Sequence, residues 1–347
     1  MIKLTPGKLW GMRRLADQNG FFMMTAVDQR PPIKTPIARH YGLDEAPYDD
    51  VARFKATLVQ TMQAGSTAML LDPHYAIPRG LVDFSPKKGL IVTLEDSLFE
   101  DTGNGRYSAT IDNWSVAKIK RMGGDAVKLL AWYRPDADLR VNRKQQDFVK
   151  SIGEQCAHFD IPFLFELLVF PLAGDTQQTK DYIEMTHKRP EHVLESVAEF
   201  AKPEYGVDVF KLESPVAAAN VPGVGGEDWQ STQHWFDELG QLVSRPWVML
   251  SAGAGKEEFF RILTHAYTAG ASGYLAGRAI WMDAFEYFPD WKRIRHALEQ
   301  DASKYMKELN QLTVTRAQPW HKHACYQGKG LDFSPADSTF RQAYRAI

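Results

Sequence analysis

Charged side chains lie inside three of the most apolar segments of this sequence. Lys128 is part of Ala-Val-Lys-Leu-Leu, Glu166 of Phe-Leu-Phe-Glu-Leu-Leu, and Lys211 of Val-Phe-Lys-Leu. A charge in such surroundings needs a partner of opposite sign, or it tends to become neutral. A neutral lysine in an apolar, partly cationic pocket is a nucleophile that forms a Schiff base with a carbonyl group. Lys211 and Lys128 are both candidates for this amine, and the charge of one would disfavour the charged form of the other.

Groups that complement these lysines follow other apolar segments. Asp28 comes directly after the first of them, and Asp28 and Glu166 are candidates for moving protons in such a reaction. Two further segments combine glycine with a hydroxyl or a guanidinium group, which suits an anion that backbone N–H groups approach closely. Their residues are Ser251, Ala252, Gly253, Gly277 and Arg278. The alternative interpretations are structural ion pairs for the charges and tight turns for the glycines.

Eight short apolar segments, separated by helical patterns, must position these groups. They are residues 20–27, 67–71, 90–94, 126–131, 162–168, 207–212, 246–250 and 272–275. Several are continuously apolar, which is typical of strands buried on both faces of a parallel sheet. Residues 50–62 and 256–268 show the three- and four-residue spacing of helices, and Thr5-Pro6 is a helix start. Strand and helix alternate eight times over about 280 residues, which predicts an α/β fold of the (β/α)8 barrel type, with the active site at the carboxyl ends of the strands.

A doubly wound nucleotide-binding sheet is the other α/β possibility, and the sequence does not favour it. No glycine fingerprint follows the first predicted strand, and the segment 253–256 lacks the spacing of a phosphate loop. We therefore predict one barrel with flanking helices over residues 1–312, followed by a C-terminal extension over 313–347. Aromatic residues make this extension too apolar to remain free in water, so we expect it to pack on the barrel or on a neighbouring subunit.

Composition excludes several classes of function. Lysine and arginine number 41 against 43 acidic residues, for a net charge of −2, which disfavours partnership with nucleic acid or a membrane. The two cysteines, Cys156 and Cys325, are too few for a disulfide scaffold and fit a reducing compartment. The amino terminus lacks the apolar core of a secretory signal. We expect a cytoplasmic protein that forms a homo-oligomer, a dimer or higher.

Two further groupings of polar residues are open to more than one interpretation. His321, His323 and Cys325 form a local cluster of possible metal ligands, but they lie in the expected extension rather than on rigid elements, which disfavours a metal site. A second anion could meet any of several cations that we expect in loops at the strand ends. These are Arg30, His74, Lys87, Lys88 and Arg106. The sequence alone does not choose among them.

Several motifs in this chain resemble the class I tagatose 1,6-bisphosphate aldolase family and its relatives that cleave sulfofructose 1-phosphate. The resemblance runs in order from about residue 20 to 320. The segments that carry it are Ala26-Val27-Asp28-Gln29-Arg30, Leu70-Leu71-Asp72-Pro73-His74-Tyr75, Asp125-Ala126-Val127-Lys128, Phe165-Glu166-Leu167-Leu168, Val209-Phe210-Lys211-Leu212-Glu213, Leu250-Ser251-Ala252-Gly253 and Leu275-Ala276-Gly277-Arg278-Ala279-Ile280-Trp281.

The resemblance implies a barrel enzyme, an aldehyde-lyase that needs no metal or cofactor and splits a phosphorylated ketose into dihydroxyacetone phosphate and an aldehyde. It implies Lys211 as the Schiff-base lysine, Lys128 as the second lysine, and Asp28 and Glu166 as the acidic pair. The residues that it implies for substrate binding are Gln29, Arg30, Ser251, Ala252, Gly253, Gly277 and Arg278. A non-catalytic regulator that binds sugar phosphates on the same barrel would need the phosphate site but not Lys211.

Overall fold

The computed structural model describes residues 3–172, 189–326 and 337–344. Within these residues, eight parallel strands form a closed barrel in the order β1-β10-β9-β8-β7-β6-β3-β2. The strands are β1 (Phe22–Ala26), β2 (Ala68–Leu71), β3 (Gly89–Thr93), β6 (Ala126–Trp132), β7 (Phe163–Leu168), β8 (Val209–Leu212), β9 (Trp247–Met249) and β10 (Gly273–Ala276). They lie within the eight predicted segments to within one residue at either end, so the predicted barrel is confirmed.

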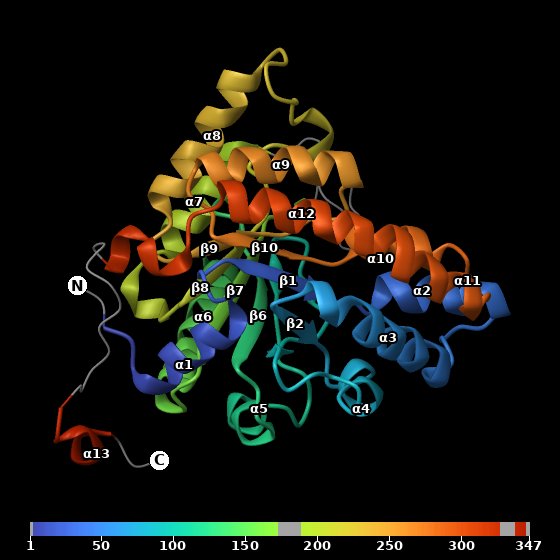
Figure 1. Cartoon of the computed structure of the whole chain (residues 1–347). Coiled ribbons are helices and arrows are strands. Elements are labelled where there is room, and N and C mark those ends of the chain that lie inside the picture. The colour runs from blue at the N-terminus through green and yellow to red at the C-terminus, as the bar shows by residue number, and fades with distance from the viewer. Residues whose placement is uncertain (1–2, 173–188, 327–336, 345–347) are drawn as a thin grey trace.

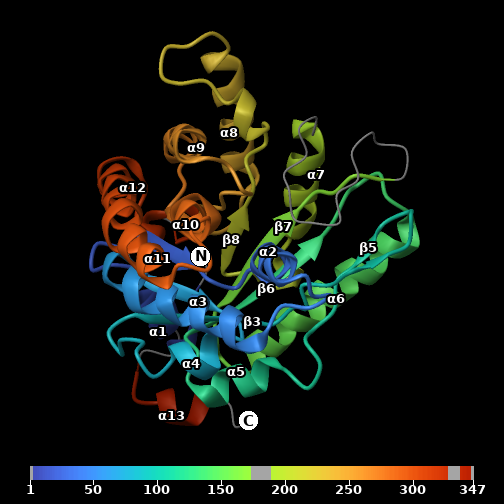
Figure 2. The ribbon, with the colours of Figure 1, turned by 90° about the vertical axis from the view of Figure 1, so that its right-hand side faces the viewer.

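Helices surround the strands on all sides (Figure 2). They are α1 (Pro6–Leu15), α2 (Pro31–Tyr41), α3 (Tyr48–Met62), α4 (Ala76–Gly80), α5 (Val116–Met122), α6 (Leu139–His158), α7 (Pro190–Phe200), α8 (Trp229–Leu242), α9 (Lys256–Thr268), α10 (Arg278–Phe285), α11 (Trp291–Ala297), α12 (Ser303–Arg316) and α13 (Phe340–Ala343). A π-helical stretch, Leu298–Ala302, joins α11 to α12. Short 3-10 turns occur at Gln63–Gly65, Pro203–Tyr205, Ala218–Asn220, Trp320–Lys322 and Ala324–Tyr326.

The two faces of the strands are buried in different layers. Side chains alternate along a strand, so residues two apart share a face. Met24, Leu164 and Val209 belong to an apolar cluster that fills the barrel interior, whereas Phe165 and Phe210 point out toward the helices. Burial on both sides explains why these segments are continuously apolar.

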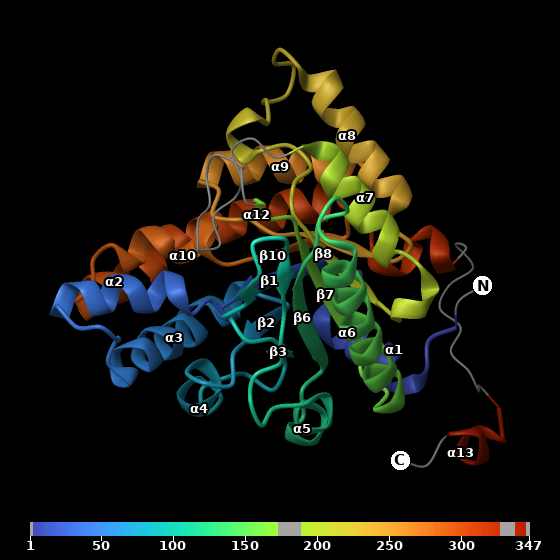
Figure 3. The same ribbon diagram turned by 180° about the vertical axis from the view of Figure 1, so that it is seen from behind.

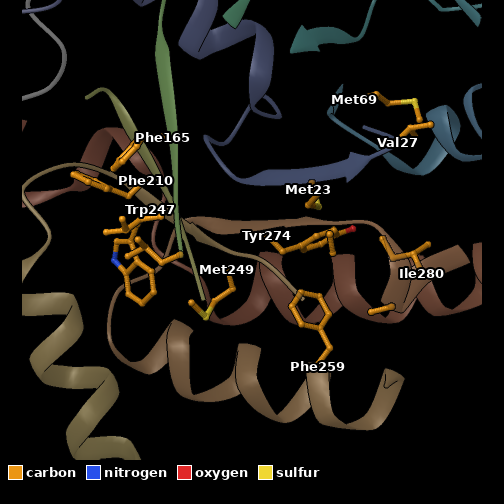
Figure 4. Packing of buried hydrophobic residues seen from close by; sticks show 14 of the residues in the cluster. Met23, Val27, Met69, Phe165, Phe210, Trp247, Met249, Phe259, Tyr274 and Ile280 are labelled. Carbon is orange, nitrogen blue, oxygen red and sulfur yellow. The ribbon is translucent and has the colours of Figure 1, made fainter. Parts of the chain in front are cut away.

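The outward layer joins the barrel to its helices through large side chains (Figure 4). Tyr274 on β10 meets Phe259 on α9 edge to face, with ring centroids 6.4 Å apart. Trp247 on β9 is 1% exposed and belongs to the same cluster. Deleting a buried aromatic side chain of this size costs about 3–5 kcal/mol, so this packing contributes strongly to holding the helices against the barrel.

The amino-terminal end of the barrel is closed by segments from both ends of the chain. Trp320 and Tyr326 are buried in the interior cluster together with Met12 of α1, and the backbone N–H of Trp320 donates to the carbonyl of Gly20 at 2.9 Å. The N-terminal segment and α13 lie at this same end of the molecule (Figures 1 and 3). Helix α12 continues to Arg316, so the domain boundary expected at residue 312 falls inside a helix.

A short antiparallel hairpin interrupts the alternation after β3. Its strands are β4 (Glu100–Asp101) and β5 (Arg106–Tyr107), and a bridge between Glu95 and Thr110 lies at its base. The hairpin lies on the carboxyl side of β3, where β5 runs beside α6 (Figure 2). It therefore adds a wall to the end of the barrel where an active site is expected.

Candidate active site

The alternation of the strands brings the predicted lysines and carboxylates to one level inside the barrel. Lys128, Glu166 and Lys211 each stand two residues beyond an interior apolar residue of their strand, and each is at most 3% exposed. Glu166 and Lys211 are register partners on neighbouring strands. Asp28 continues the interior face of β1 two residues past Ala26. Four residues that are far apart in the sequence therefore meet because of strand pairing and residue parity.

Lys128 is the centre of the resulting network. Its Nζ lies 2.9 Å from Asp28 Oδ2, 2.6 Å from Glu95 Oε1 and 2.6 Å from Glu166 Oε2. Glu166 Oε2 also accepts a hydrogen bond from Lys211 Nζ at 2.9 Å. One carboxylate oxygen thus links the two lysines, and both charged pairs are shielded from water.

The charges of these groups follow from their surroundings. Burial opposes the charge of Lys128, but Asp28, Glu166 and Glu95 outweigh it and raise its pKa above the ordinary value. Burial likewise opposes the charge of Asp28, but Lys128 and Lys211 outweigh it and hold its pKa well below the usual range. At neutral pH, Lys128 is therefore a fixed cation and Asp28 a fixed anion, and Glu166 is the carboxylate that contacts Lys211 Nζ.

Glu95 also belongs to this network; it is the polar residue that follows the third predicted strand, but it is not among the predicted site residues. Its other oxygen, Oε2, accepts from the backbone N–H of Leu130 at 3.1 Å. Burial raises the pKa of Glu95, and the attraction of Lys128 only partly offsets this. The signal was available in the sequence, because Ile91, Thr93 and Glu95 follow the same period of two that identifies Asp28.

A cavity of about 100 Å³ opens above the network. Lys211, Glu166 and Lys128 form one part of its lining, and Phe99 and Trp132 form an aromatic wall. The remaining lining residues are Asp28, Gln29, Arg30, Pro31, Pro32, Glu95, Asp96, Ser97 and Leu130. The lining therefore combines buried charged groups with an aromatic surface.

The two glycine-containing segments lie beside one another at the ends of β9 and β10. Gly253, with φ +91°, lies so close to Arg278 that a Cβ there would be 3.2 Å from its Nη1. Ala252 also has a positive φ, +49°, a conformation that costs free energy in a residue other than glycine and is concentrated at functional sites. A Cβ at Gly277 would lie 2.6 Å from Gln29 Nε2. Gly253 thus lies against Arg278, and Gly277 lies against Gln29.

The structure separates the candidates for a second anion. Arg30 is 5% exposed and borders both the cavity above the lysine network and an adjoining one of about 390 Å³, which His74 also lines. Its Nη2 donates to the carbonyl of Glu95 at 3.0 Å, whereas Nε and Nη1 have no hydrogen-bond partner in the described part of the chain. The expectation that Lys87 and Lys88 lie in loops at the active-site end is wrong. They precede β3, and Lys88 Nζ donates to the carbonyl of Ser66 at 2.6 Å at the opposite end of the barrel.

The C-terminal histidines and cysteine do not form the alternative metal centre. Residues 3–172, 189–326 and 337–344 contain no group of three His, Cys, Asp or Glu side chains that could hold a metal ion. Burial raises the pKa of the Cys325 thiol to about 11. Across the same residues, every helix is too short or too polar to cross a bilayer.

Comparison with known proteins identifies the family. The model of the DeoC/LacD family of aldolases matches residues 22–283, which span the whole barrel. This chain belongs to the DeoC/LacD aldolase family. Tagatose 1,6-diphosphate aldolase 2 of Enterococcus faecalis is 31% identical to this aldolase over 336 residues, covering 92% of this chain and 98% of the relative. Tagatose 1,6-diphosphate aldolase of Listeria monocytogenes is 32% identical over 92% and 95% of the two chains.

Solved aldolase structures share the fold of this aldolase at low sequence identity. A Schiff-base-forming fructose-1,6-bisphosphate aldolase covers 87% of this chain and 98% of its own, with a TM-score of 0.55 and 18% identity. Fructose-bisphosphate aldolase from Plasmodium falciparum covers 91% and 98%, with a TM-score of 0.63 and 11% identity. These neighbours support the barrel assignment. The contacts among the site residues are those of the structure of this aldolase itself.

Proposed function

We propose that this protein is a class I aldolase that cleaves tagatose 1,6-bisphosphate reversibly to dihydroxyacetone phosphate and glyceraldehyde 3-phosphate. The observation that carries the proposal is the buried amine of Lys211, 2.9 Å from a carboxylate that a second buried lysine holds at 2.6 Å. A Schiff-base enzyme needs a nucleophilic amine with a proton-transfer group beside it. The choice of sugar rests on family membership and on the relatives named for this substrate.

The chemistry proceeds through a protonated imine. Lys211 attacks the C2 carbonyl, the carbinolamine loses water, and the resulting iminium group accepts the electrons of the C3–C4 bond as it breaks. We assign the base that removes the proton of the C4 hydroxyl to Glu166, because its Oε2 already contacts Lys211 Nζ. Lys128 acts as the fixed cation that stabilises developing negative charge. Protonation and hydrolysis of the enamine then release dihydroxyacetone phosphate.

The two ends of the substrate take different anion sites in this proposal. The phosphate on C1 binds where Ser251, Gly253, Gly277 and Arg278 meet, on the strands that follow the one carrying Lys211. The distal phosphate binds Nε and Nη1 of Arg30, since a buried guanidinium group whose donors lack acceptors is costly until an anion supplies them.

Borohydride trapping tests the function directly. Reduction in the presence of ketose phosphate or dihydroxyacetone phosphate should attach a covalent adduct to Lys211, and Lys211→Met should abolish both the adduct and turnover. Activity should persist in EDTA. An EDTA-sensitive enzyme without an adduct would overturn the proposal. If the wild-type protein shows no turnover and Lys211→Met binds sugar phosphate as tightly as the wild type, the protein is a sugar-phosphate regulator instead. A panel of substrates that includes sulfofructose 1-phosphate, assayed by the release of dihydroxyacetone phosphate, shows whether the distal anion of the substrate is a phosphate or a sulfonate.

A further inference from the structure

A buried arginine holds the aromatic wall of the catalytic cavity from behind. Arg106, on β5 of the hairpin, is 3% exposed. Its Cζ lies 4.1 Å from the ring centroid of Phe99, 4.7 Å from that of Trp132 and 5.1 Å from that of Phe170. The rings come from three places, namely the segment directly before β4, the end of β6 and the segment after β7. One guanidinium group therefore joins three parts of the barrel mouth.

The rings are the main partners of this guanidinium group. Within the described chain, Arg106 Nε has no hydrogen-bond acceptor, and the nearest carboxylate oxygen, Asp101 Oδ2, lies 3.8 Å away. Arginine is suited to this role because its planar, weakly hydrated cation stacks on aromatic faces. Phe99 and Trp132 also meet each other edge to face, with centroids 5.3 Å apart. Trp132 also meets Phe170 edge to face, with centroids 6.5 Å apart, so the cation and the neighbouring rings together hold the wall in place.

Separate contacts anchor the hairpin that carries Arg106. Gln145 of α6 accepts from the backbone N–H of Ser108 at 2.9 Å and donates to the carbonyl of Trp132 at 2.8 Å. On the outside of the hairpin, Lys144 lies over the ring of Tyr107 at 3.8 Å. The backbone of the hairpin is therefore held independently of Arg106, so loss of the guanidinium group changes the rings more than the chain path.

The aromatic wall faces the half of the substrate that leaves as the aldehyde. In the barrel order, β9 and β10, which carry the proposed C1-phosphate residues, are diametrically opposite β6 and β3, which carry Trp132 and lead to Phe99. Lys211 on β8 lies between them around the barrel. A ketose held by its C1 phosphate and joined to Lys211 at C2 directs C4 to C6 toward Phe99 and Trp132.

We propose that Arg106 is a positioning residue that fixes Phe99 and Trp132 and thereby sets how the cavity accepts the aldehyde half of the substrate. The proposal rests on the proposed aldolase function. It predicts that loss of Arg106 impairs one reaction of Lys211 and leaves another unchanged. Formation of the imine with dihydroxyacetone phosphate does not involve the wall, whereas cleavage of the whole ketose bisphosphate does.

The test compares Arg106→Met with Lys144→Met, which removes a cation from an aromatic ring on the outer side of the same hairpin. We expect Arg106→Met to lower kcat/KM for bisphosphate cleavage by about tenfold to a hundredfold, mainly through KM, because displaced positioning groups have effects of that size. Borohydride trapping of dihydroxyacetone phosphate on Lys211 should remain as in the wild type, which also shows that the variant is folded. Arg106→Lys should restore part of the lost activity, and Lys144→Met should change neither reaction.

A second variant keeps the inference testable if Arg106→Met does not fold. Phe99→Leu removes one ring and leaves the cation. It should likewise lower the rate of bisphosphate cleavage and leave the trapping of dihydroxyacetone phosphate on Lys211 unchanged. The inference is overturned if cleavage by these variants equals that of the wild type, or if cleavage and trapping fall in the same proportion. A wild-type protein that traps no dihydroxyacetone phosphate would refute the aldolase proposal itself, so the two failures are distinguishable.

Discussion

Removing the cation at the centre of the network should destabilise the protein in a manner that depends on pH. Lys128→Met leaves Asp28, Glu95 and Glu166 buried around a space that no longer holds a charge. Each of the three contacts, at 2.6 to 2.9 Å, has a gross attraction of about 6 kcal/mol at an effective dielectric constant of about 20. Repulsion among the carboxylates and the cost of burying Lys128 offset most of this sum. The net loss on breaking such a buried pair is about 3–5 kcal/mol, which we expect for Lys128→Met at pH 8.

The pH dependence of the stability follows from the direction in which the pKa of each buried group is shifted. In the wild type, the lowered pKa of Asp28 contributes stability above its ordinary value of 3.8, and this contribution is lost as the pH falls through the folded value. The raised pKa of Lys128 contributes stability below 10.5, and this contribution is lost only as the pH rises through the folded value. Both contributions are therefore present from pH 5 to pH 8.

In Lys128→Met the carboxyl groups of Asp28 and Glu95 lose the cation that lowers their pKa, while burial continues to raise it, as it already does for Glu95. Groups with a raised folded pKa take up protons on folding, so the variant should become more stable as the pH falls from 8 to 5. The difference from the wild type should shrink over this range. Urea unfolding at each pH measures it, provided that the slope m is unchanged.

A matched control is Lys202→Met. Lys202 Nζ is also 2.7 Å from a carboxylate oxygen, that of Glu199, but its side chain is 52% exposed. An exposed pair contributes about 0.2–1 kcal/mol, so this variant should lose little stability and show no trend between pH 5 and pH 8. A loss below about 1 kcal/mol for Lys128→Met at pH 8, or one that does not shrink by pH 5, would refute the central role of this cation.

Two further predictions concern the ends of the barrel. Arg30→Met should raise KM for the bisphosphate about tenfold or more, because a charge-assisted hydrogen bond is worth about 1.5–3 kcal/mol. Lys88→Met, at the opposite end of the barrel, should leave KM unchanged. Equal effects of the two variants in steady-state assays would contradict the placement of Arg30 at the substrate site. Trp320→Ala should cost about 3–5 kcal/mol in urea unfolding because Trp320 closes the amino-terminal end, with kcat/KM unchanged at temperatures where the variant is folded. A selective loss of activity in a stable Trp320→Ala protein would contradict that role.

The part of the site that lies on strands was predictable from the sequence, because strand parity is local. Lys128, Glu166 and Lys211 interrupt apolar segments at positions that share a face with interior residues, and the barrel order then brings them together. Glu95 follows the same rule two residues past the end of β3. The strand count and the period of two are therefore enough to predict that these groups lie close together.

The loops were less predictable, because their positions depend on contacts between distant residues. Lys88 and His74 both stand near strand ends in the sequence, but one precedes its strand and the other follows it, which places them at opposite ends of the barrel. Arg106 was expected to be one of several loop cations open to an anion. Its burial among three rings depends on the hairpin pairing and on packing against the ends of β6 and β7, for which a single sequence has no local signal.

This difference between strands and loops bears on how the family varies. The lysines and carboxylates are held by pairing within the barrel, so changing them disturbs both the fold and the chemistry. The aromatic wall is held by a hairpin whose backbone is anchored to α6 by Gln145, independently of Lys211. Substitutions at Phe99 or Arg106 can therefore change which aldehyde half fits without disturbing imine formation. Relatives with the same Schiff-base network but a different hairpin should accordingly differ in the sugar that they cleave more than in the mechanism by which they cleave it.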